Sequence, residues 1–195
     1  MKGIKKIVIN NYEVLEDVVR DSYSGVVWSH KIQEKQSDIY AEKFKKMETI
    51  NIGAASLTSV GIIAMVFTDP LWLKLVSALV SFAAVYITTY FKSFDLQTLI
   101  AAHKAIANKL IAIRDQYKVL LTEIRLQNDS VENLLKRYNE LVKETDTIYL
   151  EAPSTTDEAV DRASEALKIK KDNTFSDEEI DSFLPISLRR GTNGE

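Results

Sequence analysis

Two long apolar runs with almost no space between them constrain this sequence more than any other feature. The first covers residues 50–67 and contains no charged residue, and the second covers residues 71–91 and contains only Lys74. A helix rises about 1.5 Å per residue, so roughly 20 residues cross the hydrocarbon core of a bilayer. Both runs are close to that length, which predicts two membrane-spanning helices joined by a short turn at residues 68–70.

The residues around these runs fit the interface of a membrane. Lysines stand before the first run and after the second, aromatic residues stand near the ends, and the long stem of a lysine can carry its ammonium group to the lipid head groups. The candidate interface residues are Lys45, Lys46, Trp72, Lys74, Tyr90 and Lys92. The positive-inside rule then predicts a multi-pass membrane protein with both termini in the cytoplasm and the turn outside. A soluble helical hairpin buried in a protein core is the alternative, and two adjacent runs of near-spanning length disfavour it.

Small and polar side chains recur along one face of each run, at spacings of three and four residues. The two stripes consist of Asn51, Ala55, Thr58 and Ile62 in the first run, and of Ser77, Ser81, Ala84 and Thr88 in the second. Helices in lipid associate through close packing of small residues, so one interpretation is a packing seam in which each hydroxyl bonds to a carbonyl one turn earlier. The other interpretation is the wall of an oligomeric pore that is wetted by polar groups. The pore-lining candidates are Asn51, Thr58, Ser77, Ser81 and Thr88.

A seven-residue apolar pattern follows the second run. Its members alternate steps of four and three from Leu99 to Ile148 in one unbroken phase, which is typical of a coiled coil. We expect one long cytoplasmic helix over residues 92–150, bent near Asn128, with folding back into a helical bundle as the alternative. Asn128 and the two residues after it can cap a new helix, but a loop there would usually reset the phase. Gln127 stands in the phase as a polar residue of the kind that fixes register. The candidate seam of an oligomer consists of His103, Ile106, Leu110, Ile113 and Tyr117.

These patterns divide the chain into three parts. The parts are an N-terminal preface at residues 1–25, a core at residues 26–150, and short helices with a loose tail at residues 151–195. A break is expected at residues 22–25, where two serines and a glycine gather. The core begins with a pre-membrane helix at residues 26–49, whose mixed charges indicate a solvated face.

The C-terminal part reads as two short helices. Thr156 is expected to cap a helix that runs to about Lys170, after Pro153 has ended the long helix. Ser176 and Glu179 have the spacing of a capping box at the start of a last helical turn. The apolar residues of that turn need a partner, and docking on the chain's own helices or on a neighbouring subunit is expected. These residues are Ile180, Phe183 and Leu184.

Composition excludes several classes of function. The chain has 195 residues and a formal net charge of -3, so its charge gives no case for nucleic-acid binding. It has no cysteine and only two histidines, and no ligand spacing suggests a metal site. The sequence shows no phosphate-cradling glycine loop, nucleophile elbow or serine–histidine–acid arrangement. We therefore predict a protein that is not an enzyme and uses no metal and no cofactor.

Several stretches of the chain resemble one known family. The sequence WSHKI at residues 28–32 precedes a charged pre-membrane helix, the hairpin follows, and FSDEEIDSFLP at residues 175–185 is the most specific element. The helix after the hairpin contributes Leu99, Ala102, Ile106, Leu110 and Tyr117. On these residues, about 26–190, the chain resembles the SLATT family, whose members are effectors with two membrane helices associated with SMODS nucleotidyltransferases and SLOG domains in bacterial defence islands. Its ending resembles the branch numbered five.

The resemblance implies a function that composition does not show. It implies a membrane effector of a bacterial anti-phage, abortive-infection system that oligomerises and forms a pore or disrupts the inner membrane. Its implied partners are the lipid bilayer, further copies of the chain, and an upstream nucleotide-signalling enzyme, such as a nucleotidyltransferase that makes a cyclic-oligonucleotide trigger. The alternative is a non-conducting membrane scaffold whose coiled coil recruits a partner defence enzyme. Replacing Ser81 and Thr88 by leucine would abolish the toxicity of a pore and spare recruitment by a scaffold.

Overall fold

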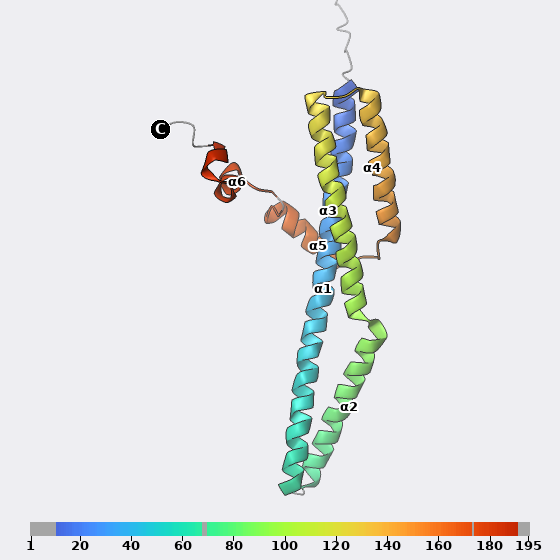
Figure 1. The fold of residues 1–195 in the computed structure, drawn as a ribbon. Helices are drawn as coiled ribbons and strands as arrows, with labels where there is room; N and C mark the ends of the chain where they lie inside the picture. Colours follow the sequence, from blue (N-terminus) through green and yellow to red (C-terminus); the bar gives the residue numbers. More distant parts are fainter. Residues whose placement is uncertain (1–10, 68–69, 173, 191–195) are drawn as a thin grey trace, which may run out of the picture.

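The computed structural model describes residues 11–67, 70–172 and 174–190, which form helices and no strand (Figure 1). In chain order the elements are α1 (Asn11–Phe67), α2 (Leu71–Phe94), α3 (Leu96–Leu126), α4 (Val131–Glu151), α5 (Asp157–Ser164), the π-helical turn η1 (Glu165–Ile169), α6 (Asp177–Phe183) and the 3-10 turn η2 (Ile186–Leu188). The predicted all-α class is confirmed over these residues. Residues 1–10 of the predicted preface and residues 68–69 of the predicted turn lie outside the described residues.

Helix α1 is a single helix of 57 residues, with a length of about 85 Å at 1.5 Å per residue. It passes without interruption through residues 22–25, so the predicted break is wrong and the expected boundary between preface and core is not a break in the helix. The helix persists because Val19 and Val26, 0% and 1% exposed, are buried on either side of that stretch. Glycine is less favourable than alanine inside a helix by about 1 kcal/mol, which is the cost of Gly25 at this position. Burying one valine stabilises the fold by about 1.5–3 kcal/mol, which outweighs that cost.

The upper part of α1 in Figure 1 forms a three-helix bundle with α3 and α4, and its lower part forms a hairpin with α2. All three helices of the bundle contribute apolar side chains to one core. Four of the five residues of the predicted seam of an oligomer lie inside this core, and the fifth, His103, is buried next to it. The members of the seam are His103, Ile106, Leu110, Ile113 and Tyr117, with exposed fractions of 1%, 5%, 0%, 1% and 1%. The seam is therefore filled within one chain, and these side chains are not available to a second copy in this structure.

The single long helix predicted over residues 92–150 is wrong, and the alternative of a bundle is confirmed. Helix α3 ends because Gln127 adopts a left-handed conformation, with φ 51° and ψ 38°, so this residue is an exposed cap instead of a seam residue. Ser130 then caps α4 by accepting a hydrogen bond of 3.3 Å from the backbone of Asn133. The heptad phase continues across the turn because both helices direct their apolar stripes to the same core.

A second change of direction separates α2 from α3. Asp95 has φ 35° and ψ 57°, and its side chain accepts a hydrogen bond of 3.3 Å from the backbone of Thr98. Aspartate visits the left-handed region more readily than most residues because its short side chain bonds locally. Helix α2 therefore diverges from the axis of α3, whereas α1 passes the same level without a break (Figure 1).

The C-terminal part begins as the sequence predicts. Helix α4 ends two residues before Pro153, and the hydroxyl of Thr156 accepts a hydrogen bond of 3.4 Å from the backbone of Ala159, which caps α5. Helix α5 and η1 lie against the middle of α1 (Figure 1). Their contact face consists of small side chains that permit a close approach. These are Ala159, Ala163 and Ala166, at 0%, 0% and 3% exposed.

Helix α6 stands beside the bundle in Figure 1. Its predicted capping box is confirmed, because the backbone N–H of Ser176 donates to Glu179 Oε2 at 2.8 Å and that of Glu179 donates to Ser176 Oγ at 3.3 Å. None of the seven residues of α6, all of which the structure describes, is buried. The predicted docking of its apolar face on the chain's own helices is therefore not seen in this arrangement.

Candidate functional site

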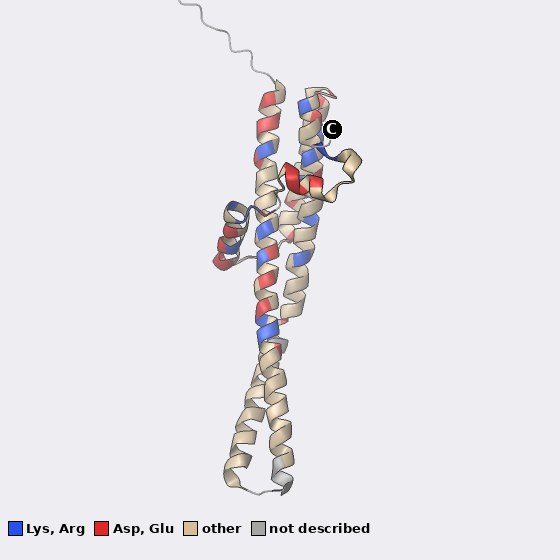
Figure 2. Ribbon diagram, turned by 90° about the vertical axis from the view of Figure 1, so that its left-hand side faces the viewer, with Lys and Arg blue, Asp and Glu red and all other residues tan. Residues whose placement is uncertain are grey.

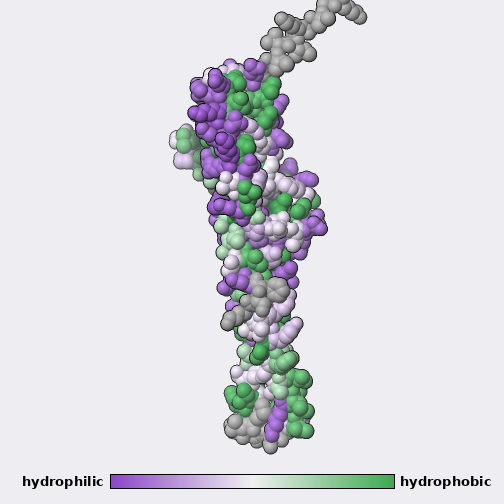
Figure 3. Space-filling view, turned by 90° about the vertical axis from the view of Figure 1, so that its right-hand side faces the viewer, coloured by the Kyte–Doolittle hydropathy of each residue, from purple (hydrophilic) through white to green (hydrophobic). Residues whose placement is uncertain are grey.

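The outer surface of the hairpin is apolar over most of its area. Large side chains of both helices are exposed, including Leu57 at 66%, Leu79 at 70% and Phe82 at 73%. Charged residues are concentrated on the bundle and on the C-terminal arm, which is the part of the chain from α5 to residue 190 (Figure 2). Hydrophobic surface gathers at the hairpin end of the molecule (Figure 3). Among the described residues, one helical stretch is long and apolar enough to cross a membrane, Leu71–Tyr90 of α2. The predicted pair of membrane helices is thus supported for α2 and not confirmed for α1.

The inner face of the hairpin brings the predicted polar stripes together. Asn51 donates a hydrogen bond from Nδ2 to Thr88 Oγ1 at 2.9 Å, and Ser81 Oγ lies 3.5 Å from Thr58 Oγ1. Ser77 of α2 is only 8% exposed and faces α1 at Gly61. All five pore-lining candidates therefore meet at the contact between α1 and α2, which is the arrangement that the packing-seam interpretation predicts.

The hydroxyl groups of this seam also bond to their own helices. Thr58 Oγ1 donates to the carbonyl of Ala54 at 2.9 Å, and Thr88 Oγ1 donates to the carbonyl of Ala84 at 2.8 Å. Asn51 Oδ1 is buried and has no partner among the described residues. A buried acceptor without a partner costs about 1–3 kcal/mol, so this end of the seam is its least satisfied point.

At Gly61, α1 lies too close to α2 to leave room for a larger side chain. A Cβ atom at this position would lie 2.4 Å from Ser77 Oγ and 3.5 Å from Ser77 Cβ. On α1 the seam differs slightly from the predicted stripe, because Ile62 is 55% exposed and the neighbouring Gly61 is buried instead. Ala55 is likewise exposed, while Ala54 is partly buried. Glycine permits the backbone contact on which packing of membrane helices depends.

The predicted interface residues lie at the two ends of the hairpin. Lys45 and Lys46 are exposed on α1 just above the Asn51–Thr88 contact, and Lys92 follows Thr88 by one turn on α2, so all three belong to the end near the bundle. Tyr90, at 46% exposed, lies at the same end. Trp72, at 65% exposed, and the exposed Lys74 lie at the opposite end, beside the turn. The structure thus sorts these residues into two levels, as a membrane with two interfaces requires.

A buried polar layer lies in the lower bundle, between the apolar core and the hairpin. His103 Nδ1 lies 2.5 Å from Gln33 Oε1, and Gln33 Nε2 donates to the carbonyl of Pro153 at 3.3 Å. Gln36, at 0% exposed, accepts hydrogen bonds from the backbone N–H and the hydroxyl of Thr156, at 2.7 Å and 2.9 Å. Two glutamines of α1 therefore hold the linker between α4 and α5 by its backbone. No pattern in the sequence indicates this layer.

His30 and Lys31 form the ionic part of this layer. Lys31 is 3% exposed, and its Nζ donates to Glu34 Oε2 at 3.0 Å and to Asp172 Oδ2 at 3.4 Å. Burial lowers the pKa of His30, the Glu34 carboxylate 3.7 Å away opposes that shift, and the charges of Lys31 and Arg114 add to it. Burial also lowers the pKa of His103. Both histidines are therefore held toward the neutral form. Lys31 ties Asp172 of the C-terminal arm to α1.

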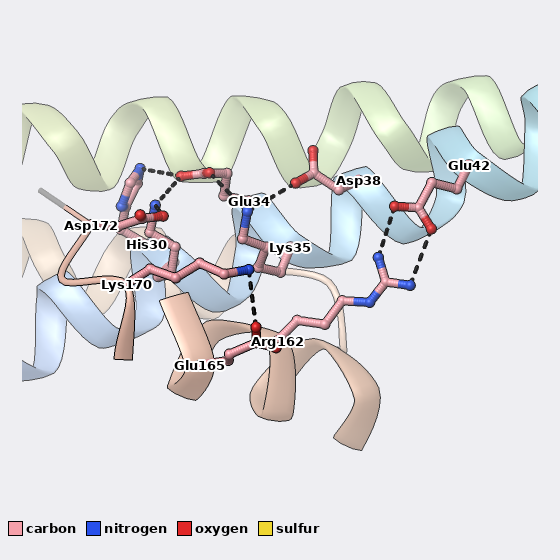
Figure 4. A network of polar contacts seen from close by, with 10 residues as sticks. His30, Glu34, Lys35, Asp38, Glu42, Arg162, Glu165, Lys170 and Asp172 are labelled. Atoms are coloured by element: carbon pink, nitrogen blue, oxygen red, sulfur yellow. Dashed lines mark hydrogen bonds and ion pairs between the residues drawn. The ribbon is translucent and has the colours of Figure 1, made fainter. Parts of the chain in front are cut away.

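Ion pairs on the surface continue the attachment of the arm to α1 (Figure 4). The guanidinium of Arg162 donates to both oxygens of Glu42, at 2.8 Å and 3.1 Å, and one of its nitrogens also donates to Glu158 at 2.8 Å. Lys35 pairs with Asp38 on α1 at 3.3 Å. The α1 charges were expected on a solvated face. Two of them, Glu42 and Lys31, pair instead with Arg162 and Asp172, which lie 120 and 141 positions away. Such pairing leaves no periodic signal, so the sequence alone did not reveal it.

The fold and the candidate site together define a class of protein. It is an all-α protein whose charged helical bundle continues into a hairpin with an apolar outer surface and a polar inner seam. Residues 15–179 match the model of the SMODS and SLOG-associating 2TM effector domain family 4. The chain belongs to this family, whose description as a two-transmembrane effector domain indicates a membrane location and a role in anti-phage defence. The resemblance to the SLATT family is confirmed, whereas the resemblance to the branch numbered five is not, since family 4 is the one that matches. Comparisons with curated proteins and with solved structures found no match.

Proposed function

We propose that this protein is an effector of abortive infection that permeabilises the bacterial inner membrane after an upstream enzyme has been activated. The observation that carries the proposal is the hairpin of α1 and α2, which exposes large apolar side chains outward and pairs polar side chains inward. Apolar surface gains about 25 cal/mol per Å² on leaving water, so this hairpin is suited to lipid. Membership of a family of two-transmembrane effector domains supports the same function.

In this proposal, residues 50–91 cross the inner membrane twice and both termini lie in the cytoplasm. The distribution of charge supports that topology, because Lys45, Lys46 and Lys92 flank the hairpin at its bundle end. Positive residues near membrane helices favour the cytoplasmic side. Trp72, at the other end, is suited to the outer interface.

Opening requires that several copies assemble and that the inner seam of each hairpin becomes accessible to water. The Asn51–Thr88 and Thr58–Ser81 pairs satisfy polar groups inside one hairpin. In the open assembly, water and neighbouring copies replace these partners, and the same groups line the conducting path. A cyclic oligonucleotide, or the nucleotidyltransferase that makes it, drives the change by binding the open state better than the closed state. The protein itself catalyses no reaction and needs no metal or cofactor.

The test is membrane integrity in bacteria that express the protein with its genomic partner, either active or catalytically inactive. Dye entry or depolarisation only with the active partner, lost in the Ser81→Leu/Thr88→Leu variant, is the expected result. Ser56→Leu/Ser59→Leu is the matched control, because these exposed serines bond, within the described part of the chain, to carbonyls of their own helix, at 2.8 Å and 2.9 Å. Intact membranes and an unchanged potential under full activation, with the protein present in the membrane, would overturn the proposal.

A non-conducting scaffold is the second candidate, and the seam itself favours it. An anchor needs a hairpin whose polar groups are satisfied internally, as they are between Thr58 and Ser81. In that case the bundle recruits a partner defence enzyme, and the membrane stays intact under activation. Recruitment of the partner to the membrane, unchanged in the Ser81→Leu/Thr88→Leu variant, would identify this function.

A further inference from the structure

An apolar groove runs between α1 and α4 at the end of the bundle farthest from the hairpin. Its cavity of about 260 Å³ is lined, among others, by Val14, Val18, Leu135 and Tyr138, and by no charged side chain among the described residues. Val14, Val18 and Leu135 are 52%, 46% and 44% exposed. A second hollow of about 250 Å³ continues the groove toward the hairpin and shares Tyr138 with the first. A fourth helix would cover these side chains and complete a four-helix bundle.

Helix α6 carries an apolar face that is uncovered in the same structure. Phe175, Ile180 and Phe183 are 65%, 43% and 80% exposed. At 100° per residue, Ile180 and Phe183 lie about 60° apart on one face of the helix, and Glu178 lies on the opposite face. Asp177 and Asp181 flank Ile180 on the side away from Phe183. The capping box fixes the start of this helix, so its apolar face is already formed before any docking.

We propose that α6 of the same chain docks in the groove between α1 and α4, with Phe183 as its anchor among Val14, Val18 and Leu135. Docking buries apolar surface on both sides, and the acidic face of α6 remains in water. The arrangement with α6 beside the bundle and the docked arrangement are two states of one arm. This inference does not depend on the proposed permeabilisation of membranes.

The attachment of the arm places α6 within reach of this groove. Asp172 is bonded to Lys31, and Lys168 lies over the ring of Trp28 at 5.3 Å. The arm therefore leaves α1 close to Lys31. Val18 lies about 20 Å farther along α1 at 1.5 Å per residue. The segment from Asp172 to Phe183 spans about 23 Å when its first four residues are extended and the rest is helical. Along the axis of α1, the tether is therefore long enough for Phe183 to reach the level of Val18. Figure 1 shows α6 beside the bundle, on the side away from α4, so docking moves the arm around α1.

The tether favours α6 of the same chain over α6 of a second copy. An arm that rises from Lys31 along α1 runs antiparallel to this helix. A second copy of the chain offers the same groove, but its α6 has no tether to that groove. A short tether raises the effective concentration of the occupant to the millimolar range, which favours docking within one chain.

The absence of cysteine from the sequence allows a direct test with the full-length protein in detergent micelles. One variant combines Ser182→Cys on α6 with Asn139→Cys, next to Tyr138 on the rim of the groove. The matched control combines Ser182→Cys with Asn108→Cys, an exposed asparagine on α3. A short bis-maleimide is expected to link the first pair within one chain at least about tenfold more than the control pair, as tethered docking predicts.

A third variant adds Phe183→Asp to the first pair. It removes the anchor without touching the linker or the bundle, and it should lower the yield of the link to that of the control pair while the circular dichroism of the bundle is unchanged. Equal yields for the two pairs, or no link at all, would overturn the proposal. A product that joins tagged to untagged chains would also overturn it, since the occupant would then be α6 of a second copy.

Discussion

Replacing Gly61 by alanine is the sharpest test of the seam between α1 and α2. The new Cβ atom would lie 2.4 Å from Ser77 Oγ, closer than the 3.0 Å below which a neighbour must shift. Gly53 lies on the same helix and has nothing within 4 Å of its own Cβ position. The two substitutions are chemically identical, so their difference reports only the contact with α2.

Two terms determine the expected magnitude. Alanine gains about 1 kcal/mol of helix propensity over glycine, and this gain applies at both positions. Only at Gly61 must the seam also give way, by rotation of the Ser77 hydroxyl or by separation of the helices, and overpacking of this kind costs about 1–3 kcal/mol. Gly61→Ala is therefore expected to be less stable than Gly53→Ala by about 1–3 kcal/mol. Adding Ser77→Ala removes the colliding oxygen and leaves an ordinary contact of 3.5 Å, so most of this loss should be recovered.

The measurement is the free energy of unfolding of the full chain in detergent micelles, followed by far-UV circular dichroism during denaturant titration. A double-mutant cycle between Gly61→Ala and Ser77→Ala isolates the coupling of the two positions. Equal changes for both glycine variants, together with no coupling in the cycle, would refute the packing of α1 on α2 through this contact.

Three further predictions concern the bundle. Leu110 is 0% exposed, and Leu110→Ala should lower the free energy of unfolding in dilute micelles by about 2–5 kcal/mol. Leu126 is 64% exposed, and Leu126→Ala should change it by less than about 0.5 kcal/mol. Equal effects of the two substitutions would contradict a core within one chain. Gln36→Leu removes the two hydrogen bonds that hold the cap of α5 and should cost about 2 kcal/mol, with faster amide exchange in α5 as its signature. Because burial lowers the pKa of His30 and of His103 below 6.5, the unfolded chain binds more protons below that pH. Stability should therefore fall as the pH drops from about 6.5 through the lower pKa values of the folded state, by at most about 1.4 kcal/mol per pH unit for each histidine, and a flat profile would contradict their burial.

Local signals in the sequence predict the elements of this fold well. The caps at Thr156 and Ser176 follow from side chains that bond to their own helix, and such bonds depend on no distant residue. The stripes of small residues predict the seam of the hairpin to within one residue, because packing of helices depends on the same spacing of three and four. The two candidate roles of the stripe, packing and pore, share one pattern, so the sequence did not distinguish between them.

Tertiary features are missed where one pattern serves two arrangements. The apolar heptad pattern is interrupted at Gln127 and resumes in the same phase. A helix that continues and a helix that turns back onto its own core produce this same pattern in the sequence. The polar layer is missed for a related reason. Gln33 and Gln36 are three residues apart on α1, and nothing nearby in the sequence indicates that the backbone around Pro153 and Thr156 will lie against them.

The two helices of the seam are connected to the bundle in different ways, and this asymmetry bears on how the hairpin can change. Helix α1 runs unbroken from the polar layer at Gln36 to the seam at Asn51, a rise of about 22 Å, so a movement of the arm against Gln36 is carried into the hairpin by a continuous helix. On the other side, α2 joins α3 through Asp95, whose left-handed backbone interrupts the helical ladder. The two hairpin helices are thus connected to the bundle in different ways. The polar pairs of the seam, such as Asn51–Thr88, lie between α1, which is continuous with the bundle, and α2, which joins it through the turn at Asp95.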